Sequence, residues 1–207
     1  QLTGLTYRLG GTVLGDLAHA YDEAGNRMQL GGTWARTGLP QPVASANYDA
    51  ANQLLTWGFQ ALSYDANGSL ISDGATSYQW DARNRLASMT GPGLSASFLY
   101  DPLGRRQRKT INGGTTESLY DGLNPVQQLA GGSVTANVLT GLDIDEYFIR
   151  TDSAGSRAFL PDALGSTLAL ADDAGSLQTE YAYEPFGATT TSGEATSSAF
   201  QYTGREN

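Results

Sequence analysis

The side chains that most often carry out chemistry are scarce in this sequence. Its 207 residues include one histidine, His19, and no cysteine. Metal sites built on several histidines and Cys–His nucleophilic pairs are therefore excluded. A serine triad would have to use His19, and the sequence has no Gly-x-Ser-x-Gly turn to carry its nucleophile. His19 lies two residues before Tyr21 in an expected strand, and we predict a satisfied or solvated strand residue there, not a catalytic base.

Three carboxylates gather in the run Asp143-Ile144-Asp145-Glu146. A calcium ion needs several converging oxygens, and acid–base catalysis uses a pair of carboxylates. In a strand, Asp143 and Asp145 would share one face while Glu146 would point away from it. Because the residues that follow, Tyr-Phe-Ile-Arg at 147–150, have strand character, the sequence favours a turn or the start of a strand over an ion site.

The basic residues concentrate in the run Arg105-Arg106-Gln107-Arg108-Lys109. The whole chain carries a formal charge of −9, from 21 acidic and 12 basic residues. Nucleic-acid binding normally requires a basic face. Along a strand these basic side chains would alternate between faces. We therefore predict a solvated edge rather than a phosphate site, and no nucleic-acid partner.

The elements that would position such residues repeat along the chain. An aromatic residue followed by an acid recurs at Tyr21-Asp22, Tyr48-Asp49, Tyr64-Asp65, Trp80-Asp81, Tyr100-Asp101, Tyr120-Asp121 and Tyr183-Glu184. Two further copies, Pro161-Asp162 and Ala171-Asp172, keep the acid without the aromatic residue. Over the first six copies the acids are 27, 16, 16, 20 and 20 residues apart. The shorter spacings fit a hairpin of two strands and a turn.

Gly or Asn stands three residues after each acid, although these two types make up only about a sixth of the chain. The nine positions are Gly25, Asn52, Gly68, Asn84, Gly104, Asn124, Gly165, Gly175 and Gly187. Glycine enters the left-handed region without a steric penalty, and asparagine tolerates it well. An aspartate that begins a type I turn can accept hydrogen bonds from the amides that follow. Each copy therefore predicts a strand, an acid-initiated turn with a left-handed residue, and a returning strand.

The composition supports an all-β fold. The 26 glycines are too many for a helical protein, and a hydrophobic share of 40% is too high for a disordered chain. The insert from Gly31 to Ala46, with Pro40 and Pro42, is predicted to be a loop. No apolar run approaches the roughly 18 residues of a membrane-spanning helix. The first residues lack the features of a signal peptide, and we expect an internal segment of a longer protein.

The tandem Tyr-Asp units resemble the YD-repeat, or Rhs, family, which includes bacterial polymorphic toxins, the shell-forming C component of insecticidal Tc toxins and animal teneurins. The likeness extends over essentially the whole chain. Residues 162–167 (Asp-Ala-Leu-Gly-Ser-Thr), 183–187 (Tyr-Glu-Pro-Phe-Gly) and 200–206 (Phe-Gln-Tyr-Thr-Gly-Arg-Glu) resemble the start of the Rhs-associated core. The resemblance implies repeats over residues 1–158 and the truncated start of that core over residues 159–207. The autoproteolysis motif of the family would lie beyond Asn207.

The resemblance also implies a fold and a function. Its tandem hairpins form a curved, spiralling antiparallel sheet, part of a hollow shell that encapsulates and helps to deliver a C-terminal toxin. This segment would be structural wall, with no catalytic residue, metal or cofactor of its own. Its expected partners are the rest of its polypeptide and the enclosed toxin, with secretion machinery or surface glycans as further contacts. The expected location is secreted or on a bacterial cell surface, without a membrane span.

The residues leave one alternative function open, an extracellular adhesion or carbohydrate-binding module. Its binding groups would be loops such as Gly31–Ala46 or a row of rings. Rings at equivalent repeat positions are expected to stack into a ladder; they are Tyr48, Tyr64, Trp80, Tyr100 and Tyr120. Cross-strand packing, worth about 0.2–1 kcal/mol per pair, is the favoured role of that ladder. An enzyme is disfavoured because no catalytic constellation is assembled.

Overall fold

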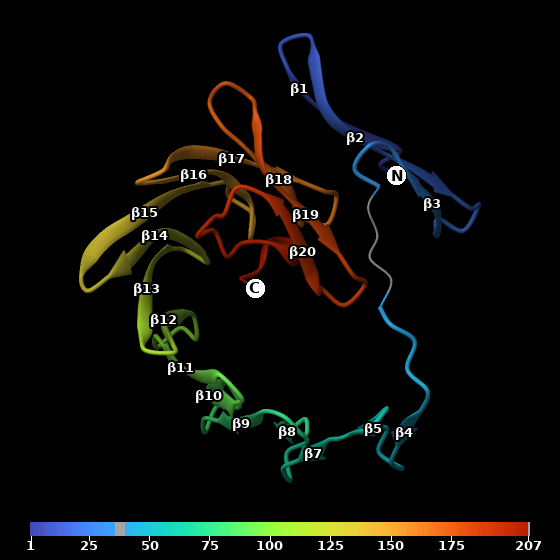
Figure 1. The fold of residues 1–207 in the computed structure, drawn as a ribbon, viewed down its shortest axis with the longest axis vertical. Helices are drawn as coiled ribbons and strands as arrows, with labels where there is room; N and C mark the ends of the chain where they lie inside the picture. The colour runs from blue at the N-terminus through green and yellow to red at the C-terminus, as the bar shows by residue number, and fades with distance from the viewer. Residues whose placement is uncertain (36–39, 207) are drawn as a thin grey trace. The chain divides into compact units, whose positions relative to one another are not determined.

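The computed structural model describes residues 1–35 and 40–206. These residues form strands joined by tight turns, with a single short 3-10 helix, η1 (Tyr202–Gly204) (Figure 1). This all-β, antiparallel organisation confirms the predicted fold class. In the described residues no helix has the length and apolar character needed to cross a membrane.

The strands follow one another in short hairpins. They are β1 (Gly4–Leu9), β2 (Thr12–Tyr21), β3 (Arg27–Gly31), β4 (Ala46–Tyr48), β5 (Leu54–Trp57), β6 (Gln60–Ala61), β7 (Ser63–Tyr64), β8 (Leu70–Ser72), β9 (Ser77–Trp80), β10 (Leu86–Gly91), β11 (Leu94–Tyr100), β12 (Arg106–Ile111), β13 (Gly114–Asp121), β14 (Asn124–Ala130), β15 (Ser133–Thr140), β16 (Tyr147–Asp152), β17 (Gly155–Pro161), β18 (Thr167–Ala171), β19 (Leu177–Tyr183) and β20 (Thr189–Gly193). Strands β7 to β20 keep their chain order in one sheet, and β1-β2-β3 and β4-β5-β6 form two smaller sheets.

The chain divides into two compact units. We call residues 1–40, 120–127 and 135–207 the core unit, and residues 41–119 and 128–134 the sheet unit.

The sheet unit is a run of hairpins with little buried apolar surface. Strands β7 to β12 each pair antiparallel with the next strand, for example through Ser88↔Ser97 and Arg108↔Glu117. Ala96 is the one buried apolar residue of this unit, all of whose residues are described. Large apolar side chains such as Leu99 and Leu119 remain exposed. Backbone hydrogen bonds and turns, more than a core, therefore define this unit.

The core unit, by contrast, has two apolar clusters. The first contains Val138, Tyr147, Phe159, Leu170, Tyr181, Tyr183 and Phe200. The second joins Leu17 of β2 and Trp34 to Leu160, Leu168, Ala169 and Ala171 of β17 and β18. Strand β18 contributes to both clusters, and each of its five residues is buried. Its continuous apolar run, Leu-Ala-Leu-Ala, suits a strand that packs on both faces.

Two segments outside the strand meander complete the core unit. At the C-terminal end, the carbonyls of Phe200 and Gln201 accept hydrogen bonds from Thr167 at 3.0 Å each, and the Phe200 ring is almost fully buried. At the N-terminal end, the Tyr7 hydroxyl donates to the Pro161 carbonyl at 2.7 Å. These contacts hold the sheet β1-β2-β3 and the C-terminal residues against β17 and β18.

The insert after β3 agrees with the loop prediction where it is described. Gly31 ends β3 and Ala46 begins β4, and residues 32–35 and 40–45 form no strand. The part of the prediction at residues 36–39 lies outside the described residues. The loop is not a free surface throughout, because Trp34 is 4% exposed and packs in the second apolar cluster.

Candidate functional site

The acid of the repeat organises its turn through its own carboxylate. In each complete case, Oδ1 accepts from the amides two and four residues later, at 2.8–3.0 Å. The six aspartates that do so are Asp49, Asp65, Asp81, Asp101, Asp162 and Asp172. Asp22 accepts from the amide and the side chain of Asn26 in the same way. The carboxylate thus satisfies amides that the turn leaves without sheet partners.

The backbone of the turn is the same in eight copies. The acid's amide donates to the carbonyl four residues later, and the amide at the Gly or Asn position donates back to the acid's carbonyl. That Gly or Asn has a positive φ, between 59° and 93°, at Gly25, Asn52, Gly68, Asn84, Gly104, Gly165, Gly175 and Gly187. This is the left-handed residue expected from the sequence. Glu184 makes the backbone pattern as well, through Ala188 and Gly187.

The ninth copy, Tyr120-Asp121-Asn124, does not form this turn. Asn124 has no positive φ and lies in β14, while the left-handed residue is Gly122. The prediction for Asn124 is therefore wrong. A turn at Gly122-Leu123 brings the strand back one residue earlier, so Asn124 is buried instead. The side-chain nitrogen of Asn124 donates to the Asp143 carbonyl at 2.8 Å, and its side-chain oxygen accepts from the Asp145 backbone amide at 2.8 Å.

In three copies the aromatic residue of the repeat ties its unit to the one before it. The polar atom of the ring donates to the carbonyl of the residue five positions after the preceding acid. Such bonds join Tyr64 to Leu54, Trp80 to Leu70 and Tyr100 to Leu86, at 2.8–2.9 Å. Tyr183 makes a similar bond at 2.5 Å, but it reaches past the copy at Asp172 to Thr167, five residues after Asp162. The expected ladder of stacked rings is thus replaced, at these positions, by ring-to-backbone hydrogen bonds. These hydrogen bonds do not require neighbouring rings to stack.

Two turns in the sheet unit carry an additional ion pair. Arg85 and Arg105, four residues after their acids, bind Asp81 and Asp101 at 2.7 and 2.6 Å. The hydrogen bonds from Arg85 lower the pKa of Asp81 to about 2. The Arg85 guanidinium also lies 4.5 Å from the centre of the Tyr100 ring, so one arginine links a turn to the ring of the next repeat.

The basic run from Arg105 to Lys109 is not a solvated edge, so that prediction is wrong. Strand β12 is an interior strand, paired with β11 on one side and β13 on the other. Arg106 lies over the Phe98 ring, and Arg108 pairs with Glu117 across the strands. Burial is the main cause that lowers the pKa of Lys109. The sequence did not reveal the partners because they come from neighbouring strands rather than from the run itself.

His19 also departs from its prediction. It lies in β2 as expected, but it is neither solvated nor satisfied. The side chain is 8% exposed, and neither ring nitrogen has a hydrogen-bond partner among the described residues. The alternation of polar and apolar residues in β2 could have placed His19 on the face of Leu17, which is buried.

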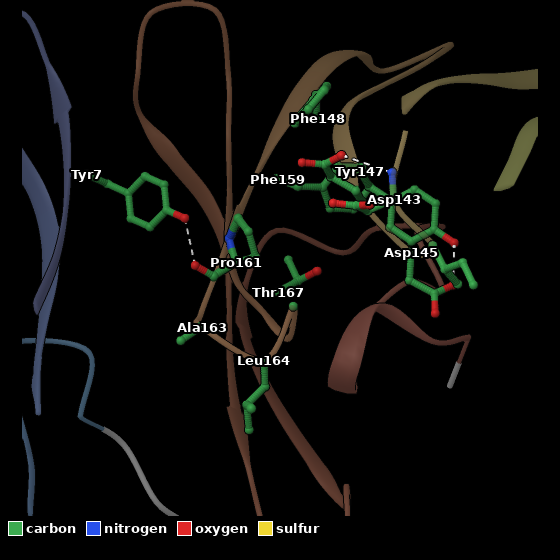
Figure 2. Close-up of a pocket in the computed structure, with 13 residues that line it drawn as sticks. Tyr7, Asp143, Asp145, Tyr147, Phe148, Phe159, Pro161, Ala163, Leu164 and Thr167 are labelled. Atoms are coloured by element: carbon green, nitrogen blue, oxygen red, sulfur yellow. Dashed lines mark hydrogen bonds between the residues drawn. The ribbon is translucent and has the colours of Figure 1, made fainter. Parts of the chain in front are cut away.

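The acidic run from Asp143 to Glu146 forms the turn before β16, as predicted, and lines a pocket of about 570 Å³ (Figure 2). Aromatic rings, among them Tyr7, Tyr147 and Phe159, line its other sides. The carboxylates have protein partners: Asp145 pairs with Arg205 at 2.8 Å, and Glu146 accepts from the Asp143 amide at 3.4 Å.

Burial is the first cause of the raised pKa values around this pocket. It raises the pKa of Tyr7 to about 12, and it raises that of Tyr147 further from its ordinary range. Both hydroxyls therefore stay protonated, and Tyr7 donates to a carbonyl. Over residues 1–35 and 40–206, no group of three or more histidine, aspartate or glutamate side chains is arranged to hold a metal ion. The carboxylates of this pocket take part in turn formation and in an ion pair, and its tyrosines in packing.

The repeated turn, the ring-to-carbonyl bond and the sequential strand order define a class of protein, a β-repeat array made of YD units. Residues 16–205 match the family model described as Teneurin YD-shell. The chain therefore belongs to the YD-shell family, as the sequence resemblance indicated.

Two curated relatives come from the genus Bacillus. The chain is 30% identical over 202 residues to the "tRNA3(Ser)-specific nuclease WapA" of Bacillus spizizenii, and 32% identical over 203 residues to the "tRNA nuclease WapA" of Bacillus subtilis. Both alignments cover 94% of this chain but 8% of the relative. The chain thus corresponds to a small part of much longer proteins.

The fold also resembles that of solved structures. One is the Tc holotoxin pore of Photorhabdus luminescens with a mutated TccC3, with a TM-score of 0.63 and 15% identity. Another is the TcdB2-TccC3 complex, with a TM-score of 0.61 and 16% identity. Each likeness covers the whole of this chain and 15% or 16% of the other. At this identity the likeness shows a shared fold.

Proposed function

We propose that this chain is a stretch of wall in a closed protein shell, which encapsulates a toxin domain of the same polypeptide and helps to deliver it. The observation that carries the proposal is the link between repeats. The rings of Tyr64, Trp80 and Tyr100 each donate to a carbonyl of the preceding unit, and the acid that follows each ring closes its own turn. Such an array extends by adding identical units and needs contacts only between neighbours. It suits a wall whose length is set by the number of repeats.

The sheet unit supports the same role. Its large apolar side chains are exposed, although its backbone is hydrogen-bonded from strand to strand. A sheet with one face toward an unfolded polypeptide would use such side chains as weak, non-selective contacts. In this proposal residues 1–158 are YD repeats and residues 159–207 begin the Rhs-associated core. The whole protein would be bacterial and would act outside the cell or at its surface.

We further propose that this segment contributes no catalytic group. Six of the repeat carboxylates are occupied by turn amides, and His19 is buried. The nuclease activity that names the Bacillus relatives would reside in parts of them that this chain does not match. Purified residues 1–207 incubated with tRNA should leave it intact, and cleavage at a rate proportional to protein concentration would overturn this statement.

Protease protection tests the encapsulation proposal. In the longer polypeptide that carries this segment, the downstream toxin domain should resist proteinase K while the wall is intact. The double variant Asp81→Ala/Asp101→Ala, which loses the turn acceptors of two adjacent repeats, should expose that domain. A matched control, Asp81→Asn/Asp101→Asn, retains an acceptor oxygen and should largely preserve the protection. Immediate digestion of the toxin domain beside an intact wall would contradict enclosure.

One observation favours the adhesion alternative. Three aromatic side chains of the sheet β4-β5-β6 region, Tyr48, Trp57 and Phe59, are exposed. Exposed rings can stack on sugars, whereas the loop ring Trp34 is buried and unsuited to that role. A glycan array with the chain and with Trp57→Ala separates the two functions. Specific binding that the substitution abolishes would support adhesion, and an absence of binding would support the wall.

A further inference from the structure

Two arginines face each other across neighbouring strands of the core unit. Arg150 of β16 and Arg157 of β17 lie directly opposite each other in the antiparallel register. Both strands are interior, since β15 and β18 pair with their outer sides (Figure 1). Like charges in directly opposite positions destabilise a sheet. Each guanidinium therefore requires negative charge close to it.

The first arginine has a carboxylate of its own. The side chain of Arg150 is 7% exposed and pairs with Asp152, which lies two residues later on the same face of β16. The Ser197 hydroxyl joins the pair, because it accepts from Arg150 at 2.9 Å and donates to Asp152 at 3.2 Å. The charge of Arg150 is thus neutralised inside the protein.

The second arginine is neutralised less well. The carboxylate beside Arg157 is that of Glu194, but the two charged groups are 3.6 Å apart and the Glu194 side chain is 64% exposed. Exposed ion pairs of this kind contribute little to stability. One N–H of Arg157 donates to the Ser156 carbonyl at 2.9 Å, and a guanidinium has further N–H donors. Arg157 can therefore bind a carboxylate that is better placed than that of Glu194.

A pocket of about 190 Å³ lies beside the two arginines. Leu170 of β18 and Thr179 of β19 line it from the sheet, and residues 194–198, which follow β20, complete its wall. Ser198 in this wall is 5% exposed, and its hydroxyl is buried without a hydrogen-bond partner among the described residues. Buried polar groups are almost always paired. The unpaired hydroxyl therefore points, independently of the arginines, to a bound polar group.

The chemistry and the size of the pocket select one class of ligand. A guanidinium binds a planar carboxylate through two parallel hydrogen bonds, and a serine hydroxyl can donate to the same carboxylate. A volume of about 190 Å³ corresponds to roughly six water-sized groups, which is enough for a carboxylate on a short stem. Leu170 offers an apolar wall to that stem. Asp152 and Glu194 would repel a second negative charge, so the ligand carries one.

We propose that this pocket binds a short monocarboxylate, either a free acid or the side chain of an acidic residue in a peptide. The bound carboxylate replaces Glu194 as the partner of Arg157 and accepts a hydrogen bond from Ser198. Glu194 then turns into solvent, where most of its side-chain surface already lies. Carboxylate binding and enclosure of a toxin are independent of each other, because every residue that lines the pocket belongs to the core unit.

NMR titration of the whole chain tests the proposal with two probes, acetate and the capped peptide N-acetyl-Gly-Glu-Gly-amide. The amide signals of Thr179 and of residues 194–198 should shift saturably, with a dissociation constant of about 1 mM for the better probe, as expected for so small a ligand. The tighter probe identifies the source of the carboxylate. Sodium chloride at the same concentration should cause no saturable shift. If neither probe gave saturation, the pocket would hold water alone and the proposal would be overturned.

Three variants separate this site from a general effect of charge. Arg157→Gln should weaken binding of the better probe by at least about tenfold, because it removes the charged donor. Glu194→Gln should tighten binding by about two- to fivefold, because it removes the internal competitor, and misfolding cannot produce such a gain. Glu23→Gln removes the same charge at an exposed position outside the pocket and should leave the affinity unchanged. Equal affinities in Arg157→Gln and the unmodified chain, or no gain in Glu194→Gln, would overturn the proposal.

Discussion

The sheet unit and the core unit use the same acid-initiated turn but bury side chains to very different extents. Asp65 and Asp162 each accept from two amides with nearly identical distances, although they lie in different units. Ala96 is the buried apolar residue of the sheet unit, whereas two clusters fill the core unit. The repeat thus specifies how strands turn and pair, and burial depends on which segments fold back over them.

The substitution with the largest expected effect removes a side chain from the better-packed unit. Leu170→Ala deletes a side chain that is 1% exposed, and we expect a loss of about 2–5 kcal/mol in the free energy of unfolding. The matched change Leu99→Ala, at a side chain that is 55% exposed, should cost less than about 0.5 kcal/mol. Denaturant unfolding of both variants provides the values. Similar losses would erase the distinction between the units.

The ring-to-carbonyl bond should also differ in strength between the units. Tyr183→Phe leaves the Thr167 carbonyl without its donor in a buried setting, which should cost about 1–3 kcal/mol. Tyr100→Phe removes the equivalent bond to Leu86 where the ring is only half-buried, and water can replace the donor. Thermal unfolding should rank Tyr183→Phe as the more harmful change, and the reverse order would contradict the burial contrast.

The left-handed turn residue should matter even where nothing crowds it. Gly104 has a φ of 87°, and a Cβ placed there would meet no atom within 4 Å. Gly104→Ala should therefore cost about 1–2 kcal/mol through backbone strain alone. Gly104→Asn should cost less, since Asn52 and Asn84 occupy the equivalent positions. Gly11→Ala, with equally open space and no positive φ, is the control that should leave the melting temperature nearly unchanged.

The turn carboxylate should have a smaller effect in the exposed unit. Asp65→Ala removes the acceptor of the Asn67 and Ser69 amides, which water can partly replace, and we expect a loss of about 1 kcal/mol. Asp65→Asn retains an acceptor oxygen and should lose less. Urea denaturation compares the three proteins. If alanine and asparagine proved equally harmful, charge rather than hydrogen bonding would have to explain the role of the acid.

The smallest expected effect concerns acid stability at Asp81. Its pKa is depressed to about 2 in the folded chain, so its contribution is present above the ordinary aspartate pKa and is lost as the pH falls from about 4 toward 2. Asp81→Asn should flatten this part of the pH–stability curve slightly. Arg85→Gln, which removes the first cause of the depression, should do the same. An unchanged acid limb in both variants would contradict the pKa assignment.

The turns were predictable from sequence because their information is local. An acid and a Gly or Asn three residues later specify the hydrogen bonds and the backbone region with no help from the rest of the chain. Asp81 and Asn84 illustrate this case, since the Asn84 amide donates to the Asp81 carbonyl and its φ is 59°. The prediction for the copy at Asn124 was wrong because Gly122, two residues earlier, takes the left-handed conformation and forms a shorter turn.

The burial pattern was not predictable because it depends on contacts between segments distant in sequence. Trp34 belongs to a proline-containing insert but packs beside Leu160 and Leu168. The basic residues of β12 gain their partners, such as Glu117 and the Phe98 ring, from the adjacent strands. His19 had an alternation signal, yet the absence of a partner for its ring nitrogens could be seen only in three dimensions.

The central claim is that this segment is part of a closed wall around an enclosed polypeptide. Electron cryomicroscopy of the longer protein that carries it tests this claim most directly. The account predicts that residues 1–207 lie in a continuous, closed β-sheet wall with non-repetitive density inside it. A well-folded array that remains open, or a closed wall with an empty interior and the toxin domain resolved outside, would contradict the claim.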